Sequence, residues 1–328
     1  MIAVVGEALV DAHRDGDLLR LFPGGGPFNT AIALGRLGVP TCYLGAVSRD
    51  RLGQELEHAL GAAGVDTRRI VRVEEPTPLA IVDLTRSEPS YGFYLSNTAH
   101  QALQREHLGD LSPEVSALHV GTLALATDPP ASAISEFAER EARLRTLVVD
   151  PNIRPSLIGD RRAYLERFEQ LSAMADLIKL SGPDLAWLYP GRSPRDAVQW
   201  LLVLGAGCVV LTHGPGGAEG WTASASAKVP ALAVTVVDTV GAGDAFGAGL
   251  LAWLWRLGRL DKRSLRVLGA RELEAALSYA AAVAAAQCTR ESAWGPTAPD
   301  VERVLDEIGG PPGGSHEENA WHRSSSTA

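Results

Sequence analysis

The chain has 328 residues, of which 46% are hydrophobic and 21% are charged, and its formal net charge is −9. This balance is typical of a globular protein with one large α/β domain or two smaller ones. The negative charge excludes a broad basic surface, so we expect binding to neither nucleic acid nor membrane. The three cysteines, Cys42, Cys208 and Cys288, are widely spaced, which favours reduced thiols in a cytoplasmic protein.

Short apolar runs alternate with helical patterns along the chain. The apolar runs predict buried strands over residues 2–9, 41–47, 117–123, 146–152, 176–181 and 208–214. The helical patterns predict helices over residues 28–38, 51–64, 131–144 and 245–255. Strands separated by helices imply βαβ units and a mainly parallel sheet, in which ligands bind beyond the carboxyl ends of the strands.

Three segments depart from this alternation. Residues 10–23 and 78–96 each have the pattern of a β-hairpin, and together they predict a small sheet on one face of the main domain. Such a sheet is a candidate lid, although the pattern suits a structural edge hairpin equally well. Residues 309–328 are rich in Gly, Pro and Ser, so we expect one domain over residues 1–308 and a disordered tail.

The stretch DTVGAGDAFGAGLL, residues 238–251, combines small residues with the start of a helix. Backbone N–H groups at a helix N-terminus bind phosphate or an oxyanion. A dinucleotide-binding loop would need a third glycine, and Phe246 stands in its place. The residues alone leave two roles for Asp244, a helix cap or a general base that accepts a hydroxyl proton.

Two motifs together resemble the signatures of one enzyme family. Residues 238–251 resemble the second signature of the ribokinase-like (phosphofructokinase-B) sugar kinases, and GGGPFNTAIALGRLG, residues 24–38, resembles the first. The resemblance extends over about residues 1–307. It implies an α/β three-layer fold with a central mainly parallel sheet and a small β-sheet lid. The activity that it implies is ATP-dependent phosphorylation of a primary hydroxyl of a small sugar.

The resemblance also implies roles for single residues. Asp244 matches the general base, and Gly241, Ala242 and Gly243 match the anion hole for the transferred phosphoryl group. The positions that match sugar-binding residues are Asp11, Gly25 and Asn29. The positions that match the nucleotide side of the site are Thr212, Gly214, Gly217 and Ser181, with Arg154 of the DPNIR motif as a candidate partner for phosphate.

The sequence departs from the family pattern at two ion sites. Ser181 and Asp184 stand where the family has NxxE, and the resemblance then implies water-mediated contact between Asp184 and Mg²⁺. Family members often hold a monovalent cation such as K⁺, which Asp238 and Val240 would bind here. Ser292 stands in a glycine position of the segment that completes this cation site.

The motifs favour fructose as the acceptor because GEALVD, DPNIRPSLIGD and TPLAIVDL are similar to fructokinase sequences. His100 departs from that pattern. The alternatives are therefore 2-keto-3-deoxygluconate, ribose or a nucleoside, or a module that senses sugar or nucleotide without turnover. The resemblance also implies a homodimer formed through the lid.

Overall fold

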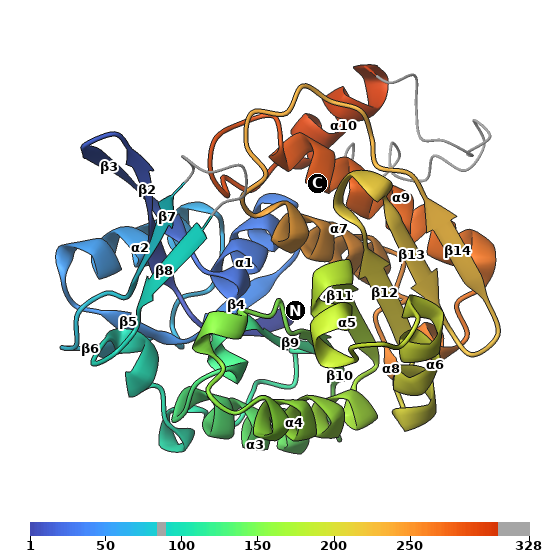
Figure 1. Cartoon of the computed structure of the whole chain (residues 1–328), viewed down its shortest axis with the longest axis horizontal. Coiled ribbons are helices and arrows are strands. Elements are labelled where there is room, and N and C mark those ends of the chain that lie inside the picture. Colours follow the sequence, from blue (N-terminus) through green and yellow to red (C-terminus); the bar gives the residue numbers. More distant parts are fainter. Residues whose placement is uncertain (84–89, 308–328) are drawn as a thin grey trace.

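The computed structural model describes residues 1–83 and 90–307, and it is built around an eight-stranded sheet (Figure 1). Six neighbouring strands pair in parallel, and the last two pairings, at one edge of the sheet, are antiparallel. From one edge to the other the strands are β4 (Thr41–Leu44), β1 (Ile2–Val5), β9 (Ala117–Gly121), β10 (Thr146–Asp150), β11 (Leu177–Ser181), β12 (Cys208–Thr212), β13 (Ala218–Trp221) and β14 (Ser226–Val229). All six predicted buried strands are present in this sheet.

Helices cover both faces of the sheet, and each face has its own hydrophobic core. The first core joins the sheet to α1 (Gly26–Arg36), α2 (Arg51–Ala62), α7 (Ala242–Arg256), α8 (Lys262–Arg266), α9 (Ala270–Gln287) and α10 (Ala298–Glu307). The second core joins it to α3 (Pro130–Glu141), α4 (Arg161–Met174), α5 (Gly182–Leu188) and α6 (Pro194–Leu204). Alternate residues of each strand face opposite cores. The three-layer α/β fold expected from the resemblance is confirmed.

A separate four-stranded sheet projects beside the main one (Figure 1). Its strands are β3 (Leu18–Gly24), β2 (Leu9–Asp15), β7 (Leu79–Asp83) and β8 (Ser90–Tyr94), in that order. The outer pairs are antiparallel, and β2 is parallel to β7. Most of the turn predicted between β7 and β8 lies outside the described residues, as does the predicted tail at 309–328.

Smaller elements complete the chain. β5 (Ala46–Ser48) and β6 (Val71–Val73) form a short parallel pair. The 3-10 helices are η1 (Ala99–Ala102), η2 (Arg105–His107), η3 (Thr122–Leu125), η4 (Pro155–Leu157) and η5 (Gly214–Gly216). The β13–β14 hairpin was not predicted, because AEGW and SAKV are short, half-exposed segments without an alternating apolar pattern.

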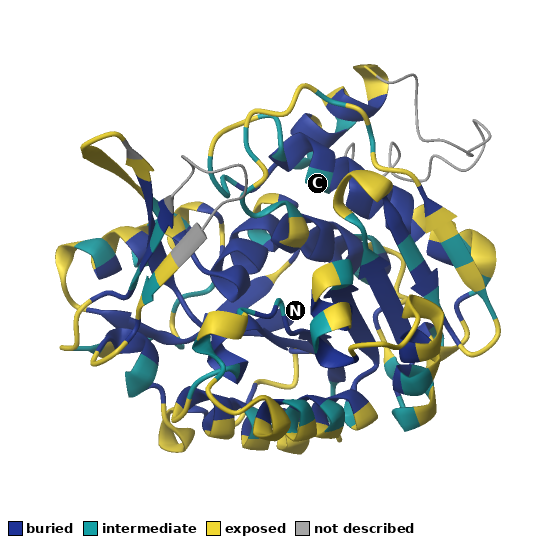
Figure 2. Cartoon of the chain, in the orientation of Figure 1, coloured by how far each residue is buried: buried dark blue, intermediate teal, exposed yellow. Residues whose placement is uncertain are grey.

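Helix α7 is buried from Asp244 to Ala252 and packs along α9 (Figure 2). Gly249 allows the close approach, because a Cβ there would lie 2.8 Å from Val283 Cγ2. The helix begins at Ala242, three residues earlier than predicted. The first turn of α7 therefore contains Asp244 and two of the three residues assigned to the anion hole. Among the described residues, no helix is long and apolar enough to cross a membrane.

Candidate active site

Asp244 lies in the first turn of α7, and its buried carboxylate contacts two amide side chains. Asn29 Nδ2 donates to Asp244 Oδ2 at 2.9 Å, and Asn152 Nδ2 lies 3.4 Å from Oδ1. The N-cap of α7 is Gly241, and no side chain caps the helix. Asp244 is therefore not the N-cap, which was one of its two predicted roles, and the first N–H groups of α7 lack a side-chain acceptor.

The charge of Asp244 depends on its buried surroundings. Burial raises the pKa of Asp244 to about 6, while the positive charge of Lys179 and the hydrogen bond from Asn29 act in the opposite direction. Lys179 Nζ lies 2.7 Å from Asp150 Oδ2, and both side chains are buried. The Asp244 carboxyl is thus largely ionised at neutral pH but takes up a proton more readily than an exposed aspartate.

The small residues before Asp244 bring backbone close to these charges. Gly241 has φ +73°, a left-handed conformation, and a Cβ there would lie 2.5 Å from Ala293 Cβ. A Cβ at Gly243 would lie 3.4 Å from Lys179 Nζ. Gly243, the last residue of the loop 241–243, therefore lies next to the buried lysine, with the positive end of the α7 dipole at the same place.

The first signature enters the site at the start of α1. Gly25 is the N-cap of α1 with φ +108°, and a Cβ there would lie 2.7 Å from Glu7 O. Glu7 accepts hydrogen bonds from Gly26 N and Ala124 N, and burial raises its pKa to about 8. This anchoring directs Asn29, one turn further along α1, towards Asp244. Asn29 Oδ1 is buried without a hydrogen-bond partner in the described structure.

Asp11 comes to the same region from the small sheet. It lies on the central strand β2, opposite Phe22 of β3 and Ala80 of β7. A Cβ at Gly24 would lie 2.1 Å from Asp11 Oδ2, so glycine at that position makes room for the carboxylate. Burial, followed by the negative charge of Asp244, raises the pKa of Asp11 to about 7.

Residues assigned to the nucleotide side lie at the ends of β11 and β12. Ser181 and Thr212 are opposite each other in these parallel strands. Gly214 and Gly217 follow with φ values of +54° and +88°. A Cβ at Gly217 would lie 2.1 Å from Val229 O, so no other residue fits this turn without a shift.

Asp184 is buried beside these strands, and both of its oxygens accept hydrogen bonds. Ile153 N donates to Oδ1 at 2.7 Å, and Ser181 donates to Oδ2 through its N at 2.8 Å and its Oγ at 2.5 Å. In contrast, Asp150 Oδ1 is buried without a partner. Across residues 1–83 and 90–307, no three His, Cys, Asp or Glu side chains converge to hold a metal ion. The donor set suits Mg²⁺ only through water and phosphate ligands.

Arg154 is bonded to the segment that precedes it and acts electrostatically on two carboxylates of the site. Its Nη1 bonds to Asn152 Oδ1 at 2.7 Å and to the carbonyl oxygens of Asn152 and Ile153. Its positive charge partly offsets the rise in the pKa values of both Asp11 and Asp244. Asn152 itself has φ +36°, a strained conformation that holds its amide towards Asp244.

Asp238 and Val240 are already bonded to other parts of the chain. The Asp238 carboxylate accepts hydrogen bonds from Val240 N at 3.0 Å and Ser292 N at 2.8 Å. Val240 O accepts a hydrogen bond from Gln287 Nε2 at 3.2 Å. Ser292 has φ +56°, which explains why glycine is usual in its place.

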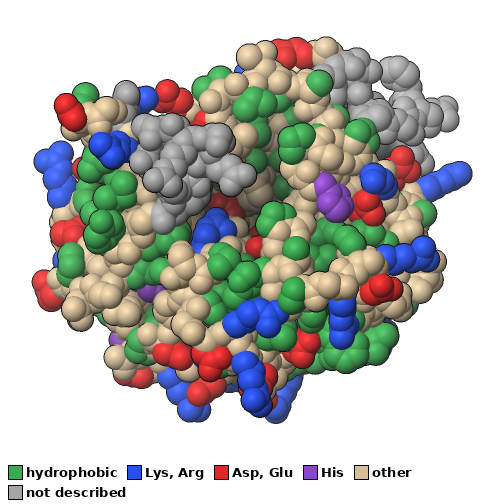
Figure 3. Space-filling model, in the orientation of Figure 1, with side chains coloured by type: hydrophobic (Ala, Val, Ile, Leu, Met, Phe, Trp, Pro, Cys, Tyr) green, Lys and Arg blue, Asp and Glu red, His purple; other side chains and the backbone are tan. Residues whose placement is uncertain are grey.

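The face that carries the small sheet is hollowed near its centre, and acidic and basic side chains are visible inside (Figure 3). A groove of about 520 Å³ separates the β2–β3 hairpin from residues 236–239. Arg20 on β3 forms two hydrogen bonds with Glu291, at 2.6 and 3.1 Å, at the edge of this groove. The hairpin therefore contacts the body of the protein beside the site.

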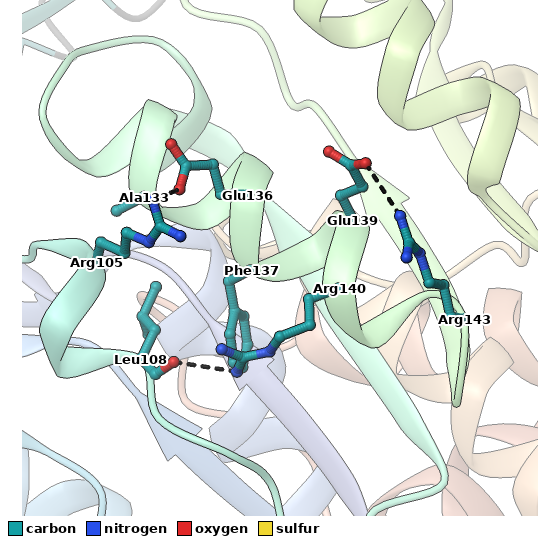
Figure 4. Close-up of a pocket in the computed structure, with 8 residues that line it drawn as sticks. All are labelled: Arg105, Leu108, Ala133, Glu136, Phe137, Glu139, Arg140 and Arg143. Carbon is teal, nitrogen blue, oxygen red and sulfur yellow. Dashed lines mark hydrogen bonds and ion pairs between the residues drawn. The ribbon is translucent and has the colours of Figure 1, made fainter.

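A second hollow lies on the outer side of α3, away from these residues (Figure 4). Its charged side chains pair with one another: Arg105 with Glu136 at 2.9 Å, and Arg143 with Glu139 at 3.5 Å. Arg140 donates to Leu108 O at 3.1 Å. These pairs leave little charge to attract a ligand, so this hollow is not a candidate active site.

The sequence pattern that defines the pfkB family of carbohydrate kinases matches residues 1–300. The chain belongs to the pfkB family. The fructokinase of Rhizobium leguminosarum bv. trifolii is 39% identical over 279 residues, which cover 83% of this chain and 85% of that protein. The expected activity, ATP-dependent phosphorylation of a sugar, is confirmed at the level of this family.

Solved structures of pfkB relatives agree with the fold over nearly the whole chain. A fructokinase from Xylella fastidiosa with bound ATP has a TM-score of 0.87 and 29% identity, covering 94% of this chain and 98% of its own. A fructokinase double mutant from Vibrio cholerae O395 with fructose, ADP and potassium ion has a TM-score of 0.83 and 26% identity. The match covers 93% of this chain and 97% of that one.

Three residues of the site were absent from the predicted set: Asp150, Asn152 and Lys179. The first two belong to the DPNIR motif, but only Arg154 of that motif was assigned a role. Lys179 could have been suspected because a lysine inside the apolar strand DLIKLS must be buried with a partner. His100 does not join the site contacts: it is buried in η1, and its Nε2 lies 2.9 Å from Thr127 Oγ1.

Proposed function

We propose that this pfkB kinase transfers the γ-phosphoryl group of ATP to a primary hydroxyl of fructose. The observation that carries the proposal is the buried Asp244 carboxylate, held by Asn29 beside the uncapped N-terminus of α7. Fructokinases are among its relatives, and one of them has been solved with fructose and ADP. These relatives favour fructose over the other acceptors.

Asp244 would act as the general base. Its carboxylate accepts the proton of the sugar hydroxyl, the hydroxyl oxygen bonds to the γ-phosphorus, and the bond to the β,γ-bridging oxygen breaks to release ADP. A pKa of about 6 suits this task, because the carboxylate is ionised at pH 7 yet basic enough to accept a proton. The amide of Asn29 keeps the carboxylate in one orientation.

Gly241, Ala242 and Gly243 would form the anion hole. Their N–H groups lie at the positive end of α7, where no side chain caps the helix. A preorganised group of N–H donors stabilises the charge on the phosphoryl oxygens during transfer. Lys179 lies beneath Gly243 and adds positive charge to the same place. Arg154, which is close enough to influence Asp244, would help to neutralise the phosphoryl group.

The sugar would lie between β2 and α1. Asp11 is suited to accept hydrogen bonds from two hydroxyl groups, and the unpartnered Asn29 Oδ1 to accept one more. Gly25 lets the backbone approach the sugar closely. The β2–β3 and β7–β8 hairpins would act as a lid, which excludes water from the transfer.

The nucleotide would bind beyond β11 and β12, along Ser181, Thr212, Gly214 and Gly217. Mg²⁺ would bind mainly to the phosphates and water, with Asp184 as a water-mediated contact. When bound, the ion neutralises phosphate charge. Two further proposals concern the whole molecule: a cytoplasmic enzyme with one kinase domain over residues 1–308, and a homodimer through the small sheet, where Leu18, Leu19 and Leu21 are exposed.

The test of the proposed function is a coupled assay that measures ADP release with fructose, 2-keto-3-deoxygluconate, ribose and adenosine. We expect the highest kcat/KM with fructose and a product phosphorylated at a primary hydroxyl, as identified by NMR. A higher kcat/KM with another acceptor would contradict the choice of fructose. Binding of sugar and ATP without any turnover would instead favour the sensing module.

A further inference from the structure

Gln287 is the last residue of α9, and its buried side-chain amide joins three segments of the site. Nε2 donates to Val240 O at 3.2 Å and to Ser292 O at 2.6 Å. Oε1 accepts from Gly295 N at 3.1 Å. Both amide hydrogens and the amide oxygen therefore have partners, and Val240 directly precedes the loop 241–243.

These contacts allow only one orientation of the amide. If Oε1 and Nε2 were exchanged, the oxygen would face two carbonyl oxygens and the nitrogen would face the N–H of Gly295. The indole of Trp294 also donates to Gln287 O at 3.0 Å, which ties the end of α9 to the same segment. Nε2 is thus held as a donor between the Val240 and Ser292 carbonyls.

A monovalent cation at Asp238 and Val240 does not fit this arrangement. A cation needs carbonyl and carboxylate oxygens that point at it with no N–H donor in the space between them. Here the Val240 carbonyl faces the amide hydrogens of Gln287, and both oxygens of Asp238 accept N–H groups, from Val240 and Ser292. A K⁺ ion between the two carbonyls would meet the partial positive charge of the two hydrogens on Nε2.

We propose that the Gln287 amide takes the place of the monovalent cation that the family resemblance implies. The side chain bridges the Val240 and Ser292 carbonyls as a cation would, and it does so without adding a charge. Gln287 acts through Val240 and is therefore a positioning residue of the anion hole. The consequence is an enzyme whose activity and stability do not depend on K⁺.

The first test compares the wild-type protein in KCl, NaCl and tetramethylammonium chloride at equal ionic strength. We expect the same kcat in the three salts and the same melting temperature. A saturable rise in either quantity that is specific for K⁺ would overturn the proposal. The melting measurement needs no substrate, so it decides the question even if the assumed sugar kinase activity is not found.

The second test uses Gln287→Ala, which leaves the Val240 and Ser292 carbonyls without their donor and opens space between them. We expect kcat to fall roughly tenfold in tetramethylammonium chloride and to recover in part when KCl replaces it. A kcat equal to that of the wild type, or one that K⁺ does not raise, would contradict the proposal. Thr289→Ala is the matched control, because its Oγ1 bonds only to Ala286 O at the same helix end.

Discussion

Asn29 Nδ2 donates a hydrogen bond of 2.9 Å to Asp244 Oδ2, across 215 positions of the sequence. The bond connects the first turn of α1 with the first turn of α7, so the two signature motifs meet at the carboxylate. It has two consequences for the mechanism. It fixes the orientation of the proposed base, and it leaves Asn29 Oδ1 without a partner, as the proposed contact with the sugar requires.

Removal of the Asp11 carboxylate should weaken sugar binding. Because a hydrogen bond to a charged group contributes about 1.5–3 kcal/mol, we expect Asp11→Ala to lower kcat/KM for fructose by roughly 10–150-fold. The KM for ATP should not change, since Asp11 lies on the sugar side. Asp17→Ala, an exposed substitution at the tip of the same hairpin, is the control. A rise in the KM for ATP alone would contradict the assignment.

Activity should depend on pH through two carboxylates. The pKa values of Asp244 and Asp11 are raised to about 6 and about 7, and both groups must be ionised to act. The log of kcat/KM should therefore rise with pH, approach a slope of two below pH 6, and become constant above about pH 8. Initial rates from pH 5 to 9 measure this profile. A constant kcat/KM down to pH 5 would show that neither shifted carboxylate is required.

Replacement of Lys179 should affect both stability and the titration of Asp244. Lys179→Met leaves Asp150 buried without its partner, so the free energy of unfolding in urea should fall by about 3–5 kcal/mol. Because Lys179 lowers the pKa of Asp244, the pH of half-maximal kcat/KM should rise. The double variant Lys179→Met, Asp150→Asn should recover part of the stability.

Lys262→Met is the matched control for Lys179. Lys262 Nζ also lies 2.7 Å from an aspartate, Asp176, but at the amino end of β11 and with a half-exposed lysine. The control should lose less stability and keep the pH profile of the wild type. An unchanged profile in Lys179→Met as well would mean that the lysine has no influence on the base.

The two glycines that flank α7 allow the effect of backbone strain to be distinguished from the effect of a displaced anion hole. Gly241 and Gly258 flank the helix with φ values of +73° and +62°, and only Gly241 has a neighbour that a Cβ would strike. We expect Gly258→Ala to cost about 1 kcal/mol of stability and to keep kcat. Gly241→Ala should lower kcat by at least about tenfold, because it displaces the N–H groups of the anion hole. Equal kcat values in the two variants would contradict an anion hole at residues 241–243.

The sequence predicted the sheet better than it predicted the charge network beneath the candidate site. The buried strands were found because each is a short apolar run that ends in a polar or glycine cluster. The Lys179–Asp150 ion pair was missed because the spacing of apolar residues predicts single strands and helices. This spacing does not tell which strands lie side by side in the sheet. Helix α7 was predicted to begin too late, since glycines weaken a helical pattern even where the helix has begun. The hydrogen bonds of the Gln287 amide could not be predicted from the sequence, because they depend on where the side chain lies in the folded protein.

We propose that Asp244 accepts the proton of the sugar hydroxyl, and single-turnover kinetics with Asp244→Asn measure the step in which this transfer occurs. The amide keeps the shape of the carboxylate but cannot accept the proton, so the rate of phosphoryl transfer should fall by about 10²–10⁴-fold, with unchanged binding of ATP. Asp261→Asn, at the exposed N-cap of α8, should keep the wild-type rate. A transfer rate in Asp244→Asn equal to that of the wild type would show that Asp244 is not the general base.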